Sequence, residues 1–394
     1  MLTDVDLTRQ ISERLLDRNQ LLEDFFAQHA HSLALACQEM AQRFLRGGRL
    51  LAFGRGPSST DAQHVSVEFV HPVIVGKRAL PALDLSAQIR PWLDSILHPD
   101  DIVMGFGPPE GDAEVSNALD WARAQGAMTF ALPGPAGSFA LQTEIRHPFL
   151  HQELVEILYH TMWETVHVFL EHREFGQDVG QAEFLYPFLG QSKQETSAIV
   201  DQVAASILMK VHDDTQLRTR LAEEEAETLC AAALAVHTRL IHGGKLILFG
   251  NGGSATDAND WALDCVMPPG GLRGIPAISL SMEPANITAL ANDVGPEVIF
   301  LRQLIAHGRS EDVAIGISTS GGSRNIIMAL EEARKRRMLT VALLGNDGGE
   351  IARRGLVDFA IIVRSDYIPR IQEVQASAYH VITEILEELS DARA

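Results

Sequence analysis

One stretch decides the fold: Leu246-Ile-Leu-Phe-Gly-Asn-Gly-Gly-Ser-Ala-Thr-Asp-Ala258. It joins a short apolar run, typical of a buried strand, to a glycine-rich turn and the start of a helical pattern. Nearly the same order of residues occurs 196 positions earlier, as Leu50-Leu-Ala-Phe-Gly-Arg-Gly-Pro-Ser-Ser-Thr-Asp-Ala62. The chain therefore contains two copies of one strand–turn–helix unit.

Two further matches show that the whole unit is duplicated. Asp101-Ile-Val-Met-Gly105 corresponds to Asp312-Val-Ala-Ile-Gly316, at an offset of 211. Gln152-Glu153 with His160 corresponds to Gln372-Glu373 with His380, at an offset of 220. The growing offset indicates about two dozen extra residues inside the second copy. We predict a first domain over 1–172, a connector over 173–195, where the periodicity is lost, and a second domain over 196–394.

Strands and helices alternate along both copies. Each copy opens with a long amphipathic helical stretch, over 5–46 and 196–242, and its last helix is expected to start at the Gln-Glu pair. The predicted strands are Leu50–Phe53, Ile102–Phe106 and Met128–Leu132 in the first copy, and Leu246–Phe249, Val313–Ile317, Leu339–Leu343 and Phe359–Val363 in the second. This order predicts an α/β fold in which each copy is a doubly wound α-β-α sandwich around a parallel sheet, flavodoxin- or Rossmann-like.

Composition narrows the class of protein. The 394 residues carry 32 Lys+Arg against 52 Asp+Glu, a net charge of −20. Such an acidic surface disfavours nucleic acid and anionic membranes as partners. The acidic N-terminus lacks the basic, apolar pattern of a signal peptide, and Cys37, Cys230 and Cys265 form no paired motif. We therefore expect a cytoplasmic protein.

Two loops of the second copy suit a small anion. Gly250-Asn-Gly-Gly-Ser254 lets the backbone approach a ligand, although glycine-rich turns are also common for steric reasons alone. Ser318-Thr-Ser-Gly-Gly-Ser323 places four hydroxyls before a predicted helix, which suits a phosphate monoester; the simpler alternative is helix capping by one serine. Neither loop carries the dinucleotide or P-loop fingerprint, so a nucleotide cofactor, a dehydrogenase and a kinase are disfavoured.

These motifs, with Ala291-Asn-Asp-Val-Gly295, Gly345-Asn-Asp-Gly-Gly349 and Arg370-Ile-Gln-Glu373, resemble the sugar-isomerase (SIS) family, in its phosphoheptose (sedoheptulose-7-phosphate) isomerase branch. The resemblance covers 196–394 closely and 1–172 more distantly, so it implies two tandem SIS domains. Because a single SIS domain of that branch normally forms a tetramer, it also implies a homodimer that makes a pseudo-tetramer.

The resemblance implies roles for particular residues. Glu68 would be the base and His160 the acid of an aldose–ketose isomerisation. The candidate zinc ligands are these two residues together with His64 and Gln152. The second-copy counterparts of His64, Glu68 and His160 are Asp260, Asp264 and His380. The shorter Asp264 is expected to withdraw its carboxylate by about 1.5 Å. The implied substrate-binding residues are Asn251, Gly252, Ser254, Asp293, Ser318, Thr319, Ser320, Ser323 and Gln372.

The copies have lost opposite features. The first keeps the His/Glu/Gln/His set but has Gly107-Pro-Pro-Glu-Gly-Asp112 in place of the hydroxyl-rich loop. Either the copies complement each other at a shared interface, or each has decayed and the protein binds a phosphosugar without converting it. The first explanation predicts a phosphoheptose isomerase acting on sedoheptulose 7-phosphate or a related sugar phosphate through a cis-enediol. The alternative is a non-catalytic, regulatory phosphosugar-binding protein.

Overall fold

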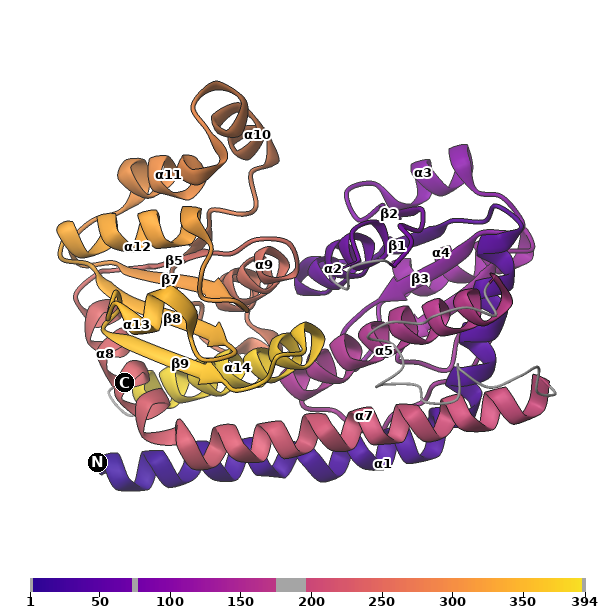
Figure 1. Ribbon diagram of the computed structural model, residues 1–394, viewed down its shortest axis with the longest axis horizontal. Helices are drawn as coiled ribbons and strands as arrows, with labels where there is room; N and C mark the ends of the chain where they lie inside the picture. The colour runs from indigo at the N-terminus through magenta and orange to yellow at the C-terminus, as the bar shows by residue number, and fades with distance from the viewer. Residues whose placement is uncertain (1–2, 73–76, 175–195, 392–394) are drawn as a thin grey trace. The chain divides into compact units, whose positions relative to one another are not determined.

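The computed structural model describes residues 3–72, 77–174 and 196–391. They form two compact units, which we call the N-terminal unit (residues 20–215) and the C-terminal unit (residues 1–19 and 216–394). Each unit contains one parallel sheet with helices on both faces (Figure 1). Of the predicted connector, residues 175–195 lie outside the described residues.

The sheet of the N-terminal unit has the strand order β2-β1-β3-β4, with every pair parallel. Leu50 and Ala52 face helices α2 and α5, whereas Leu51 and Phe53 face α3 and α4. The elements are β1 (Leu50–Phe53), α2 (Ser59–Val70), β2 (Ala82–Asp84), α3 (Ile89–Ile96), β3 (Ile102–Phe106), α4 (Ala113–Ala124), β4 (Met128–Leu132) and α5 (Pro148–Glu174).

The sheet of the C-terminal unit has the order β6-β5-β7-β8-β9, again parallel throughout. Helices α8, α9 and α14 cover one face, and α11, α12 and α13 cover the other. The elements are α8 (Ala226–Ile241), β5 (Leu246–Phe249), α9 (Gly253–Val266), β6 (Ala277–Ser279), α10 (Pro284–Asp293), α11 (Ile299–His307), β7 (Val313–Ser318), α12 (Arg324–Lys335), β8 (Leu339–Gly345), α13 (Gly349–Arg353), β9 (Phe359–Val363) and α14 (Ile368–Asp391).

Burial on both faces explains the strand sequences. Every residue of β3 and of β7 is buried, which is why these strands are continuous apolar runs. The predicted doubly wound fold is confirmed. Two strands were missed, β2 and β6, because each has only three residues and both are partly exposed. They lie at the edges of their sheets.

The helix boundaries differ from the sequence prediction in two ways. The stretch 196–242 is not one helix: it divides into α7 (Thr196–Glu224) and α8, with a break at Glu225, whose φ of −121° is not helical. The last helix of each copy begins four residues before the Gln-Glu pair, at Pro148 and at Ile368. Proline suits the first position of a helix because its N–H would be unpaired there in any case.

Two long helices contribute to both units. Helix α1 (Asp4–Leu45) gives Leu7, Ile11 and Leu15 to the core of the C-terminal unit, and its residues from Leu22 onward to the core of the N-terminal unit. Helix α7 does the reverse: Val203 and Ile207 pack in the N-terminal unit, and Leu217 and Leu221 in the C-terminal unit.

We call the part of α1 that packs in the C-terminal unit and the part of α7 that packs in the N-terminal unit the exchanged segments. Each carries a buried or half-buried cation that pairs with a glutamate of the unit in which it packs. Within the N-terminal unit, Lys210 of α7 pairs with Glu164 of α5. Within the C-terminal unit, Arg14 and Arg18 of α1 pair with Glu384 of α14, at 3.1 and 2.7 Å. Since Glu164 and Glu384 occupy equivalent positions at the offset of 220, the two copies use the same device.

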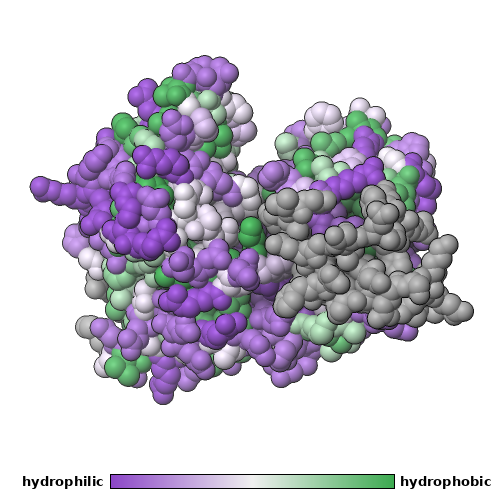
Figure 2. Space-filling model, viewed as in Figure 1, coloured by the Kyte–Doolittle hydropathy of each residue, from purple (hydrophilic) through white to green (hydrophobic). Residues whose placement is uncertain are grey.

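Helices cover the sheets, and the exposed surface that these helices form is mostly polar. On the face drawn in Figure 2, hydrophilic side chains cover most of the C-terminal unit and hydrophobic ones occur in small groups. Within residues 3–72, 77–174 and 196–391, no helix has both the length and the apolar character needed to cross a membrane.

Candidate functional site

The hydroxyl-rich loop Ser318–Ser323 lies beside the glycine-rich loop after β5. Strands β5 and β7 are parallel neighbours, and the helices that follow them, α9 and α12, pack on opposite faces of the sheet. The two loops therefore flank the topological switch point, where open α/β sheets bind their ligands.

The hydroxyl of Ser323 is not used to cap the helix that follows the loop. Ser323 is the N-cap residue of α12, and its side chain makes no capping hydrogen bond. Within the loop, the Gly321 N–H donates to Ser318 Oγ at 3.1 Å and the Gly322 N–H to Ser320 Oγ at 3.3 Å. The capping alternative is therefore wrong for Ser323. The N-terminus of α12 carries a partial positive charge that favours an anion.

A second glycine-rich turn, Gly345–Gly349, packs against the loop Ser318–Ser323. A Cβ on Gly321 would lie 2.1 Å from the Gly348 carbonyl oxygen, and one on Gly349 would lie 2.2 Å from the Ser320 carbonyl oxygen. Asn346 Nδ2 also donates to the Thr319 carbonyl oxygen at 3.3 Å. The sequence alone gave this motif no structural role. In the structure, its backbone packs closely against the loop Ser318–Ser323.

The glycine-rich loop is held by similar close approaches. Gly252 has a φ of +57° and begins the turn into α9, and a Cβ on Gly250 would lie 2.1 Å from the Ser254 carbonyl oxygen. Asn251 and Asn325 exchange two amide hydrogen bonds, at 3.0 and 2.9 Å. Asn325 was missed because it lies beyond the hydroxyl-rich stretch.

The remaining predicted substrate residues keep the status of predictions. Ser254 and Gln372 are buried, on α9 and α14. Asp293 ends α10 on the surface, where its carboxylate accepts a local hydrogen bond from Asn292 Nδ2 at 2.8 Å.

The equivalent loop of the N-terminal unit contains its own anion. Asp112 is the N-cap of α4 and accepts hydrogen bonds from the backbone N–H groups of Glu114 and Val115, at 2.8 and 3.0 Å. Arg55 lies 3.5 Å from Asp112 and 3.0 Å from Glu114. Because a carboxylate already occupies the N-terminus of the helix, this loop is unsuited to a phosphate.

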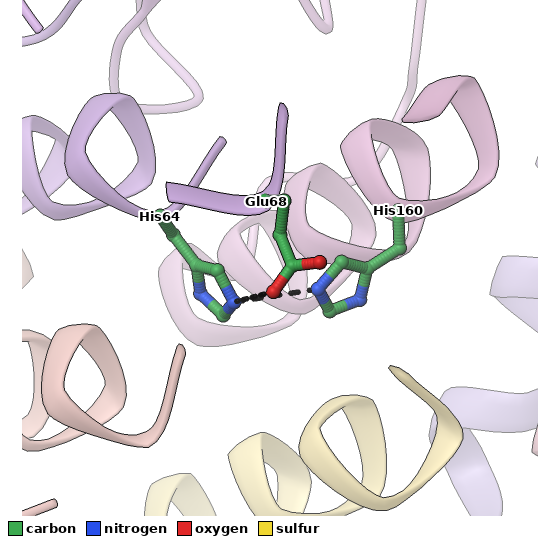
Figure 3. Close-up of side chains that lie close together, drawn as sticks. All are labelled: His64, Glu68 and His160. Carbon is green, nitrogen blue, oxygen red and sulfur yellow. Dashed lines mark hydrogen bonds and ion pairs between the residues drawn. The ribbon is translucent and has the colours of Figure 1, made fainter. Parts of the chain in front are cut away.

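Three of the four predicted acid–base and metal residues come together in the N-terminal unit. Figure 3 shows His64 and Glu68 on α2 and His160 on α5 turned toward one another. His64 Nε2 lies 3.3 Å from His160 Nε2 and 3.9 Å from Glu68 Oε1. All three side chains are buried. Gln152 lies on the same helix, two turns before His160, and is half-buried.

Burial controls the protonation of this cluster. Loss of solvation, together with the smaller effect of the nearby Glu164 carboxylate, raises the pKa of Glu68 to about 8. Burial also lowers the pKa of His64 well below its ordinary value, with His160 adding to the effect. In the protein alone, Glu68 is therefore mainly protonated and His64 neutral at pH 7.

The cluster fits a metal ion. One ligand atom from each of His64, Glu68 and His160 lies within 4.8 Å of the others. Among the described residues, Glu68 Oε2 is buried without a hydrogen-bond partner. Imidazole nitrogens and a carboxylate oxygen are donors that zinc accepts.

The C-terminal unit holds a related but more acidic cluster. Asp260, Asp264 and His380 are all buried and have ligand atoms within 4.8 Å of one another. Despite its shorter side chain, Asp264 still lies 3.4 Å from His380 Nε2, and Tyr379 donates its hydroxyl to Asp260 at 2.8 Å. Burial raises the pKa of Asp264, and His380 opposes that change.

Parts of the chain are similar to known proteins. A family model described as "SIS domain" matches residues 211–345. A phosphoheptose isomerase from Leptospira biflexa is 41% identical over 184 residues, which are 46% of this chain and 93% of that relative. A phosphoheptose isomerase from Sulfurimonas denitrificans is 41% identical over 193 residues, or 48% and 93% of the two chains.

Several solved structures match nearly the whole chain. The C-terminal domain of glucosamine-fructose-6-phosphate aminotransferase from Francisella tularensis covers 96% of this chain, which covers 95% of that domain, with a TM-score of 0.63. At 9% identity, that likeness concerns the fold alone.

The chain belongs to the SIS-domain family. Within that family, the relatives that it matches at 41% identity are phosphoheptose isomerases, and each aligns with about half of this chain. The predicted α/β fold, with a parallel sheet between helices in each unit, is confirmed.

Proposed function

We propose that the protein is a phosphosugar aldose–ketose isomerase that interconverts sedoheptulose 7-phosphate and D-glycero-D-manno-heptose 7-phosphate, or a closely related pair. The observation that carries the proposal is the loop Ser318–Ser323, whose N-cap hydroxyl makes no capping bond at the N-terminus of α12. Phosphate binding far from the reacting carbons supplies the energy that positions the sugar.

The chemistry requires a base and an acid. Glu68 would remove the proton from the carbon next to the carbonyl, and His160 would protonate the carbonyl oxygen, which gives the cis-enediol. Return of the protons to the opposite positions completes the isomerisation. As an alternative to this acid–base role, His64, Glu68 and His160, with Gln152 as a fourth candidate, would hold zinc, which would polarise the carbonyl oxygen. We expect a homodimer, as the resemblance to phosphoheptose isomerases implies. We also expect a reducing, cytoplasmic environment, since Cys37, Cys230 and Cys265 are all buried and outside any disulfide.

A second candidate function is phosphosugar sensing without turnover. It is favoured by the C-terminal unit, where the hydroxyl-rich loop occurs together with Asp260 and Asp264 in place of the histidine and glutamate. Asp260 in place of the histidine changes both the charge and the proton-transfer properties of the cluster, whereas Asp264 keeps the carboxylate of the glutamate on a shorter side chain.

Turnover and binding distinguish the two functions. The purified protein is incubated with sedoheptulose 7-phosphate, with and without Zn²⁺, and the aldose product is measured. Glu68→Gln should abolish turnover but retain binding of the sugar phosphate. Binding without product in the unsubstituted protein would favour the sensor, and turnover retained by Glu68→Gln would refute the assignment of the base.

A further inference from the structure

We propose that Asn325 is a positioning residue of the phosphosugar site, because its amide pair with Asn251 ties the two ligand loops together across the switch point. Asn251 lies between β5 and α9, and Asn325 is the second residue of α12. The two helices pack on opposite faces of the sheet, so the loops diverge from adjacent strands. The two hydrogen bonds between the amides, at 3.0 and 2.9 Å, bridge that divergence.

The N-terminal unit has the same tie in a different chemical form. At the offsets of the duplication, Arg55 corresponds to Asn251 and Glu114 corresponds to Asn325. These two residues form an ion pair at 3.0 Å. Both members of the pair have changed and the contact has been kept. A contact of this kind is retained for the geometry that it imposes, since the chemistry of its members differs completely between the units.

The form of the tie fits the charge that each unit can accept. In the C-terminal unit, a carboxylate at position 325 would stand in the first turn of α12, where a phosphate is proposed to bind, and would repel it. The amide pair keeps the loops joined without adding charge. In the N-terminal unit Asp112 already caps the helix, so Glu114 opposes no phosphate there.

Asn325 therefore acts through Asn251 and the loop that carries it. Its Oδ1 also accepts from the Ile326 N–H at 2.9 Å, which orients the side chain on the helix. The inference rests on the proposed function only for its effect on ligand binding. The tie itself is judged from the loops in the absence of ligand.

The test is a double-mutant cycle in the full-length chain with Asn251→Ala, Asn325→Ala and the double variant. Amide hydrogen exchange of residues 250–254 and 318–323 is measured without ligand, and binding of sedoheptulose 7-phosphate and of inorganic phosphate by calorimetry. Each single variant should speed exchange in both loops and weaken phosphosugar binding by about 3- to 10-fold, as expected for losing about one net hydrogen bond. In the double variant, the amides of both loops should exchange no faster than they do in the faster-exchanging single variant.

The N-terminal unit supplies both the rescue and the control. Asn251→Arg with Asn325→Glu should restore slow exchange in both loops, while Asn325→Glu alone should weaken phosphate binding most. Arg55→Ala, which breaks the equivalent tie, should leave phosphosugar binding unchanged. Additive effects in the cycle, or unchanged exchange of residues 250–254 in Asn325→Ala, would overturn the proposal. If the unsubstituted protein binds no sugar phosphate, the proposed function fails, and the exchange data still decide on the tie.

Discussion

Replacing Glu68 with glutamine should stabilise the metal-free protein at neutral pH. Burial raises the pKa of Glu68 from 4.5 to about 8, so the folded protein holds a proton that the unfolded chain releases. Stability is therefore lost as the pH rises from about 4.5 to 8, the interval between the two pKa values. The difference amounts to about 5 kcal/mol above pH 8 and about 3 kcal/mol at pH 7.

The assay is urea unfolding in the presence of a chelator at several pH values from 4.5 to 8.5. Glu68→Gln cannot ionise, so its advantage over the unsubstituted protein should be near zero at pH 4.5 and should grow with pH. Glu144→Gln, at an exposed position on the surface, is the matched control. A Glu68→Gln protein that is no more stable at pH 8, or a difference that does not vary with pH, would refute this account of the cluster.

Three further predictions follow from the described contacts. Zn²⁺ should raise the melting temperature of the unsubstituted protein more than that of Glu68→Gln, and equal shifts would contradict a site at Glu68. Lys210→Met should destabilise the protein by about 3–5 kcal/mol in urea, because it removes the cation that pairs with the buried Glu164; unchanged stability would show that the pair is unimportant. Gly321→Ala should abolish phosphosugar binding, because Gly321 has a φ of +59° and a Cβ there would clash with the Gly348 carbonyl oxygen. In Gly322→Ala the nearest atoms to the new Cβ lie 3.9 Å away, so this variant should bind normally. Calorimetry measures both affinities, and equal values would contradict the packing argument.

The strands that bury both faces were predictable, because their apolar runs and glycine-rich ends repeat in the two copies. The three-residue edge strands β2 and β6 were not, since so short a stretch carries no periodicity. The break at Glu225 was also missed: neither glycine nor proline marks it in the sequence.

The candidate site was predictable only where residue type and spacing carry the information. The i, i+4 spacing of His64 and Glu68 places them on one helical face, and the duplication identified His160. The tie between Asn251 and Asn325 depends on two loops meeting across the sheet, 74 residues apart in sequence. A signal for it was present in the coupled change to Arg55 and Glu114, but only contact geometry shows that those positions meet.

The exchanged segments of α1 and α7 bear on how the duplicated gene can change. Leu7, Ile11 and Leu15 complete the core of the C-terminal unit, and Val203 and Ile207 complete that of the N-terminal unit. A deletion that removed either copy at the repeat boundary would also remove part of the other copy's core and the cation that pairs with Glu164 or Glu384. Each copy is free to lose ligand-binding motifs one residue at a time, but neither can be discarded whole. Because each copy supplies a helix segment to the other copy's core, the duplication is hard to reverse. The copies can still diverge by losing ligand-binding motifs.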